Sequence, residues 1–102
     1  MQIDFIRTGG ITGVRLTTSV DTTQLPPDQA VTLHKLIDDS RFFDLPENMA
    51  PPKPMPDRFE YRLTIASAEQ THSIVAYDGA VPDTLRPLLN YLTTMAMVSK
   101  NR

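Results

Sequence analysis

Apolar and polar residues alternate in two parts of the chain, and each part predicts a β-hairpin. In the first part the alternation is interrupted at residues 9–13, where three glycines within five residues favour a turn with positive φ angles. It then resumes in a second strand up to residue 20. The alternating positions of this first hairpin are Ile3, Phe5, Arg7, Val14, Leu16, Thr18 and Val20.

The second hairpin begins after Asp57 and has the clearest alternation in the sequence. One face of its first strand carries Phe59, Tyr61, Leu63 and Ile65, and the other carries Arg58, Glu60, Arg62 and Thr64. Residues 67–70 form a plausible turn into a strand with His72, Ile74 and Ala76 on one face, which ends at Asp78-Gly79. One apolar and one polar face are typical of an open, mostly antiparallel sheet.

Two further segments show the spacing of amphipathic helices. Pro26, Pro27 and Asp28 favour a helix start, because proline is tolerated in the first turn and an acidic residue complements the helix dipole. Residues 42–46 then predict a hydrophobic anchor under the end of this helix. For the second helix, an N-cap at Thr84 would place Pro87 in the first turn. The apolar stripes are Ala30, Leu33, Leu36, Ile37 and Ser40, and Leu85, Leu88, Leu89, Leu92 and Met95 or Ala96.

These elements predict one α+β domain spanning residues 1–102, with a ββαββα order. We expect a four-stranded sheet, antiparallel or mixed, with both helices packed on one face and a long proline-rich loop before the third strand. If the strand after this loop runs parallel to residues 14–20, then the loop's end, the glycine tip and the Asp78-Gly79 turn share one edge of the sheet.

The proline-rich segment Pro46–Asp57 holds five of the nine prolines and two of the five methionines. Proline fixes φ and lacks an N–H donor, so this segment predicts a stiff, exposed loop. Such a loop suits contact with another protein, because little conformational entropy remains to be lost on binding. The alternative is a long connector without a binding role.

Composition excludes several classes of function. A net charge of −2 gives no reason to expect nucleic acid or an anionic membrane as a partner. The absence of cysteine excludes disulfides and thiolate metal sites, and no segment approaches the length of a membrane span. With no secretory signal pattern at the start of the sequence, we expect a cytoplasmic monomer without a cofactor.

No pattern of catalytic residues emerges from the sequence. The two histidines, His34 and His72, lack metal-ligand spacing, and no serine lies in a G-x-S-x-G elbow. The adjacent carboxylates Asp38 and Asp39 diverge on a helix, and the glycine tip joins two strands instead of opening a helix, as a phosphate-binding loop would. The residues therefore favour binding over catalysis, and we expect no enzyme activity.

The whole chain resembles emfourin, the bacterial protein inhibitor of thermolysin-family zinc metalloproteases such as protealysin. The resemblance rests on the order and spacing of several short motifs. They are Phe5-x-Arg7-x-Gly9-Gly10-x-x-Gly13, Leu36-Ile37, Phe42-Phe43-Asp44-Leu45-Pro46, Asp57-x-Phe59-x-Tyr61, His72 and Leu85-x-x-Leu88-Leu89.

This resemblance implies a non-enzymatic inhibitor whose partner is a protealysin-like protease, with the zinc ion belonging to the enzyme. It also implies that a loop aspartate approaches this zinc, while apolar loop residues occupy substrate subsites. We assign the aspartate to Asp57, which ends the stiff loop just before a strand anchors it, and place Asp78 second. Asp57 could instead cap the backbone of its own loop.

For the apolar contacts we select Ile11 at the glycine tip, with Gly9 and Gly10 beside it, and Met49 and Met55 in the proline-rich loop. Each apolar side chain could equally fold back onto the sheet, since exposure is not visible in sequence. The alternative function is a protein-interaction adaptor that uses the same loop for a partner that is not a protease.

Overall fold

The computed structural model describes residues 1–9, 15–49 and 59–100, with side chains described up to residue 98. Its strands are β1 (Gln2–Gly9), β2 (Leu16–Asp21), β3 (Asn48–Met49), β4 (Phe59–Ala66) and β5 (Thr71–Tyr77). Its helices are α1 (Pro27–Ser40) and α2 (Arg86–Lys100), with short 3₁₀ turns at Thr22–Gln24 and Phe42–Asp44.

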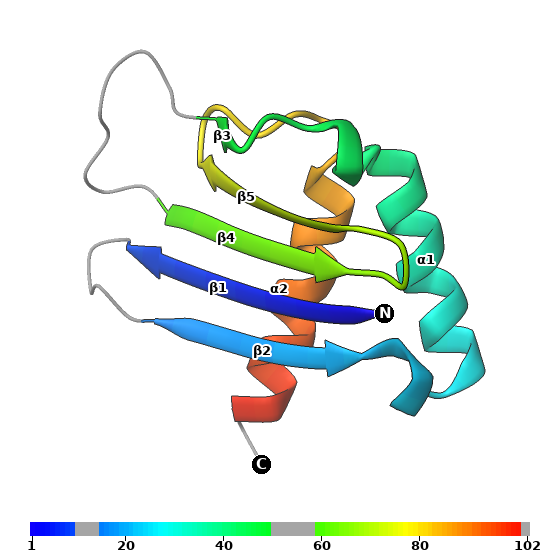
Figure 1. Cartoon of the computed structure of the whole chain (residues 1–102). Helices are drawn as coiled ribbons and strands as arrows, with labels where there is room; N and C mark the ends of the chain where they lie inside the picture. Colours follow the sequence, from blue (N-terminus) through cyan, green and yellow to red (C-terminus); the bar gives the residue numbers. More distant parts are fainter. Residues whose placement is uncertain (10–14, 50–58, 101–102) are drawn as a thin grey trace.

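The strands form one sheet in the order β2-β1-β4-β5-β3 (Figure 1). Both predicted hairpins are present, and β1 joins them by pairing antiparallel with β4 from Gln2↔Ala66 to Gly9↔Phe59. The predicted turn at residues 67–70 is confirmed by the N–H of Ser67, which donates to the C=O of Gln70 at 2.8 Å.

The prediction of four strands was wrong, because the described part of the chain has a fifth strand, β3, between α1 and β4. Asn48 and Met49 pair parallel with Val75 and Ala76, and the N–H of Val75 donates to the C=O of Glu47 at 2.8 Å. The first part of the predicted proline-rich loop is thus an edge strand. A strand this close to Pro46 is tolerated at the edge of the sheet, because an edge strand forms hydrogen bonds on one side only and proline lacks an N–H donor.

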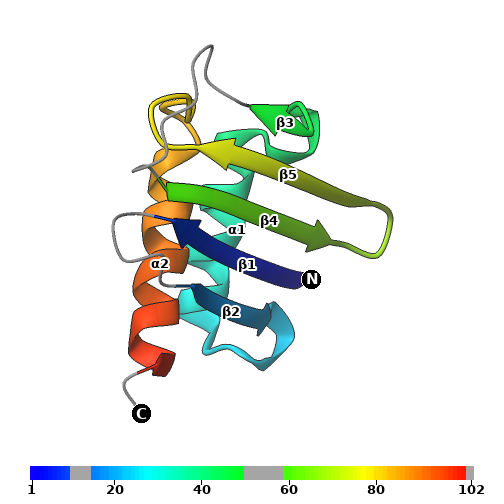
Figure 2. The same cartoon turned by 90° about the vertical axis from the view of Figure 1, so that its left-hand side faces the viewer.

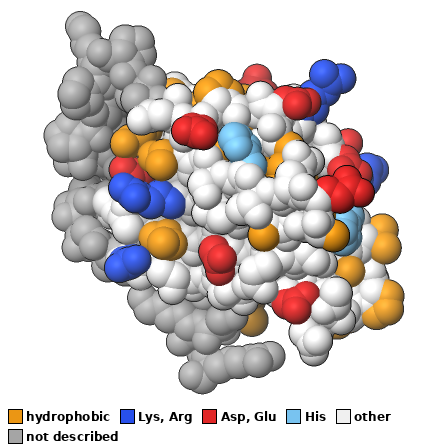
Figure 3. Space-filling model, viewed as in Figure 1, with side chains coloured by type: hydrophobic (Ala, Val, Ile, Leu, Met, Phe, Trp, Pro, Cys, Tyr) orange, Lys and Arg blue, Asp and Glu red, His pale blue; other side chains and the backbone are white. Residues whose placement is uncertain are grey.

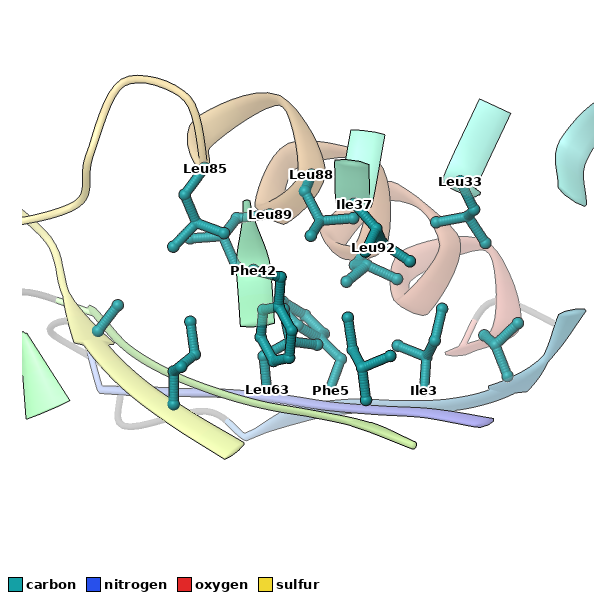
Figure 4. Close-up of a cluster of buried hydrophobic side chains, with 14 of the residues drawn as sticks. Ile3, Phe5, Leu33, Ile37, Phe42, Leu63, Leu85, Leu88, Leu89 and Leu92 are labelled. Carbon is teal, nitrogen blue, oxygen red and sulfur yellow. The ribbon is translucent and has the colours of Figure 1, made fainter. Parts of the chain in front are cut away.

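Both helices lie on the same face of the sheet, as predicted, and leave the other face uncovered (Figure 2). The core lies between the two layers (Figure 4). Its fully buried large side chains come from β1, β4 and β5, from both helices, from the turn after α1 and from the residue that precedes α2: Ile3, Phe5, Leu33, Phe42, Leu63, Ile65, Ile74, Leu85, Leu88 and Leu92.

The hydrophobic anchor after α1 is confirmed. Phe42 is buried against the edge of Phe43, with ring centroids 5.3 Å apart. Behind it, Nε2 of His72 hydrogen-bonds the C=O of Leu45 at 2.7 Å, and the rings of His72 and Phe42 are 5.4 Å apart. The chain between α1 and β3 is therefore fixed to β5.

Helix α2 begins one residue later than the predicted N-cap implies. The C=O of Leu85 accepts the N–H of Leu89 at 3.1 Å, so Leu85 and not Thr84 flanks the helix. Pro87 is the second helical residue, in the first turn as predicted. Over the residues described, neither helix combines the length and the apolar character that a bilayer span requires.

Candidate functional site

The ends of three predicted loops meet at one end of the sheet, which we call the loop end; it comprises Gly9, Met49, Phe59, Tyr77 and Asp78 (left in Figure 1). Strand register fixes this arrangement. Gly9 pairs with Phe59, Glu60 pairs with Tyr77, and the N–H of Asp78 donates to the C=O of Phe59 at 2.9 Å. The prediction that the loops share an edge is confirmed for these strand ends, because β2 and β4 run parallel on either side of β1.

Three of the selected site residues lie at the loop end. Gly9 has a φ of 101°, in the region that favours glycine and that the predicted turn required. Met49, in β3, is half-buried and packs against the core, so only part of its side chain faces solvent. Asp78, the third, directly follows β5. The other four selected residues lie outside the described residues: Gly10, Ile11, Met55 and Asp57.

Asp78 lies in a tight turn whose geometry confirms the Asp-Gly prediction. Gly79 has a φ of 89°, and the N–H of Ala80 donates to the C=O of Tyr77 at 2.9 Å. Its side chain is half-buried. Among the described residues the ion pairs are Arg62–Glu60 and Arg86–Asp83, and neither includes Asp78.

On the helix-covered face of the loop end, Arg7 and two aromatic residues form a cluster. The guanidinium carbon of Arg7 lies 4.3 Å from the ring centroid of Phe59, and the Phe59 and Tyr61 rings are 6.4 Å apart. Burial raises the pKa of the Tyr61 hydroxyl, the charge of Asp78 raises it further, and Arg7 opposes both effects. Charge and aromatic surface are thus brought together where the loops begin.

The Nε atom of Arg7 is buried and has no hydrogen-bond partner among the residues that the structure describes. This is unusual, because buried polar atoms are nearly always satisfied and an unsatisfied one costs about 1–3 kcal/mol. Nε therefore contributes no described hydrogen bond, while the guanidinium group stacks on the ring of Phe59.

The uncovered face of the loop end carries a second polar cluster. Nε of Arg62 donates to Oε2 of Glu60 at 3.0 Å, which lowers the pKa of that carboxyl group, and Tyr77 and Thr8 lower it further against the effect of burial. The bond to Glu60 in turn raises the pKa of Tyr77. Figure 3 shows charged side chains of both signs scattered over this face. The prediction that Glu60 and Arg62 share the polar face of this strand is confirmed.

The described residues offer no group of three or more His, Cys, Asp or Glu side chains that could hold a metal ion. His34 is exposed on α1, and His72 is engaged with Leu45. As far as the described part of the chain shows, its chemistry consists of polar and aromatic contact groups, which suits binding to another molecule.

Sequence reasoning missed the pairing of Arg7 with Phe59. The signal was present, since Arg7 occupies an inward position of the first strand's alternation, where an apolar residue is expected. The partner could not be found, because it depends on the register between strands that are far apart in the sequence.

Comparison with known proteins gives one result. Residues 5–93 match the family model described as Emfourin, which covers most of the chain. No curated protein and no solved structure matches the chain.

Proposed function

The chain belongs to the emfourin family, a family of metalloprotease inhibitors, and from this premise we propose that it inhibits a thermolysin-family zinc protease of the protealysin type. It does so by occupying the active site of the enzyme. The observation that carries this proposal is the family match over residues 5–93. The meeting of three strand ends at the loop end supports it, because one surface can then present several loops together.

The inhibitory group in this proposal is the carboxylate of Asp57. A thermolysin-type zinc has two histidine ligands and one glutamate ligand, which leave an open position for the attacking water. A carboxylate placed there displaces this water and blocks the reaction. Asp57 precedes the first residue of β4 by two positions in the sequence, and β4 is paired on both sides from its start. In this proposal, the inhibitory carboxylate therefore lies next to an anchored strand.

Asp78 is the second candidate for the zinc-directed carboxylate. It lies at the same end of the sheet, tied to Phe59 through its backbone N–H. Its charge acts on Tyr61, however, so it also has a role within the protein's own structure.

The apolar contacts to the substrate subsites are proposed to come from Ile11, Met49 and Met55, with Gly9 and Gly10 shaping the tip that carries Ile11. A stable interface buries about 800 Å² on each partner, which is more than one loop supplies. We therefore expect at least two of the loops to contact the enzyme. The free inhibitor is proposed to be a monomer.

The test is a titration of a protealysin-like protease with the purified protein. The remaining protease activity is measured by the hydrolysis of a peptide substrate. Stoichiometric loss of activity, with the chain uncut, is the expected result. The Asp57→Ala variant should raise the inhibition constant at least about tenfold, since about 1.4 kcal/mol of binding corresponds to that factor. Its melting temperature should not fall.

The Asp78→Ala variant is the matched comparison, because it removes the second candidate carboxylate from the same end of the sheet. If Asp78→Ala weakens inhibition and Asp57→Ala does not, the zinc-directed group is Asp78. Full protease activity in the presence of the wild-type protein would reject the inhibitor function and favour the adaptor alternative.

A further inference from the structure

We propose that Arg7 is a positioning residue for inhibition. Its guanidinium stacks on Phe59 and thereby holds the ends of β1 and β4 in a fixed orientation at the loop end. This inference rests on the proposed function and deepens it. Arg7 lies within the sheet and does not itself contact the protease in this proposal. Its effect on binding is exerted through Phe59.

The first argument is the position of Arg7 in the fold. It lies on β1, a strand paired on both sides, and faces the helix layer together with Ile3 and Phe5, which are fully buried. A leucine at this position would pack without the cost of desolvating a guanidinium. The Nε atom is buried and has no described partner, so the cost of desolvating that atom is not offset by a hydrogen bond. Residues that break the packing rules in this way are expected at functional positions.

The second argument is what the guanidinium touches. At 4.3 Å from the ring centroid it lies over the face of Phe59, a cation–π arrangement in which the planar group of arginine also stacks. Arg7 pairs in register with Tyr61, and Phe59 is the next residue along β4 on the same face. This contact therefore runs diagonally from Arg7 on β1 to Phe59, the first residue of β4. We call it the Arg7–Phe59 brace, because it connects the two strands.

The third argument concerns the other groups that face this brace. Tyr61 lies between the Phe5 and Phe59 rings, at centroid distances of 6.2 Å and 6.4 Å. Asp78 and Arg86 act on the Tyr61 hydroxyl by charge, and Asp78 is bonded to the C=O of Phe59 through its N–H. A change at Phe59 is thus transmitted to the Asp78 turn, so that one side chain on β1 influences two of the three strand ends at the site.

A first experiment needs no protease. Amide hydrogen exchange of the free protein should show faster exchange at the Asp78 N–H in the Arg7→Leu variant, by about tenfold, because its acceptor on Phe59 loses the brace. The Ser67 N–H, bonded at 2.8 Å at the opposite end of β4, is the internal control and should not change. Unchanged exchange at Asp78, or equal acceleration at both amides, would overturn the inference.

A second experiment measures inhibition together with stability. Arg7→Leu should raise the inhibition constant about tenfold while the melting temperature stays equal or rises, because the buried Nε without a described partner is removed. A merely structural role would lower the melting temperature instead. Arg7→Lys should not rescue inhibition, since an ammonium group lacks the planar stack. Lys35→Leu, on the exposed face of α1 and outside the loop end, is the matched control for the loss of a positive charge and should leave inhibition unchanged.

A double-variant comparison isolates the contact itself. Phe59→Leu should weaken inhibition by a similar factor, and the Arg7→Leu, Phe59→Leu double variant should be no weaker than either single variant, because both remove the same brace. If the losses of inhibition in the two single variants add up in the double variant, the positioning role is rejected. It is also rejected if Arg7→Leu inhibits as strongly as the wild-type protein. Failure of the wild-type protein to inhibit would instead reject the proposed function.

Discussion

Glu60 shows how a single side chain on the uncovered face contributes to stability. Arg62 holds its carboxylate at 3.0 Å, and the pKa of Glu60 is lowered from its ordinary 4.5 mainly by this bond. Because the pKa is lower in the folded state than in the unfolded state, the ionised carboxylate stabilises the fold above the unfolded-state pKa. This contribution is lost as the pH falls through the folded-state pKa.

We therefore expect Glu60→Gln to lower the free energy of unfolding at pH 7 by less than about 1 kcal/mol, since the pair is partly solvent-exposed. The difference from the wild type should shrink as the pH is lowered from 5 to 3. Urea denaturation at pH 7, 5 and 3 measures this. Glu69→Gln, in the exposed turn after β4, serves as the control, and a Glu60→Gln deficit that is independent of pH would contradict the argument.

At the scale of elements, the end of α1 is set by one residue in an unfavourable backbone conformation. Arg41 has φ 52° and ψ 46°, in the left-handed region where helices commonly place glycine. This conformation turns the chain so that Phe42 enters the core. The side chain of Arg41 is exposed, so the requirement at this position is one of backbone geometry.

Arg41→Gly should stabilise the protein by about 0.5–1 kcal/mol. Glycine removes a steric cost of about 1–2 kcal/mol in the folded state, but part of this gain is lost because glycine also raises the conformational entropy of the unfolded chain. Lys35→Gly, at an exposed position in the interior of α1, is the matched control and should destabilise by about 0.5–1 kcal/mol. Chemical denaturation of both variants checks the signs. A loss of stability in Arg41→Gly would show that the arginine side chain matters more than the backbone angle.

At the scale of the whole molecule, the core joins the two halves of the chain. Side chains from β1 and α1 are buried with those from β4, β5 and α2. Neither hairpin has an apolar layer of its own against which to pack. We therefore expect the described residues to unfold as one cooperative unit, which is the physical content of the proposed single domain over residues 1–102.

Thermal unfolding followed by far-UV and by near-UV circular dichroism should give the same transition curve. The first signal reports helices and strands, and the second reports the packing of Tyr61 and the other aromatic residues. Superimposed curves are expected for one cooperative unit. Two separate transitions would show that the halves unfold independently and would contradict the single-domain proposal.

Much of this fold could be predicted from the sequence, for a definite reason. The hairpins and helices each have one buried face, and a buried face leaves a periodic pattern in the sequence. Strand β3 has two residues, which is too short for a pattern, and its pairing depends on Val75 and Ala76 of a distant strand.

The site could be predicted only in part. The glycine at residue 9 and the Asp78-Gly79 turn follow from local backbone preference, and both have the expected positive φ at glycine. The stack of Arg7 on Phe59 has no local signature, because it arises from the pairing of β1 with β4. Such a contact can be predicted only if the register between the two strands is known, and this register is a property of the assembled sheet.

The pairing of β1 with β4 also determines the order in which this protein can be assembled. Each hairpin closes through residues that are close in sequence, whereas the seam between them joins residues 2–9 to residues 59–66. Closing so long a segment carries an entropic cost that local pairing avoids, and contacts of this kind slow folding. We therefore expect the pairing of the second hairpin with β1 to be a late step of folding.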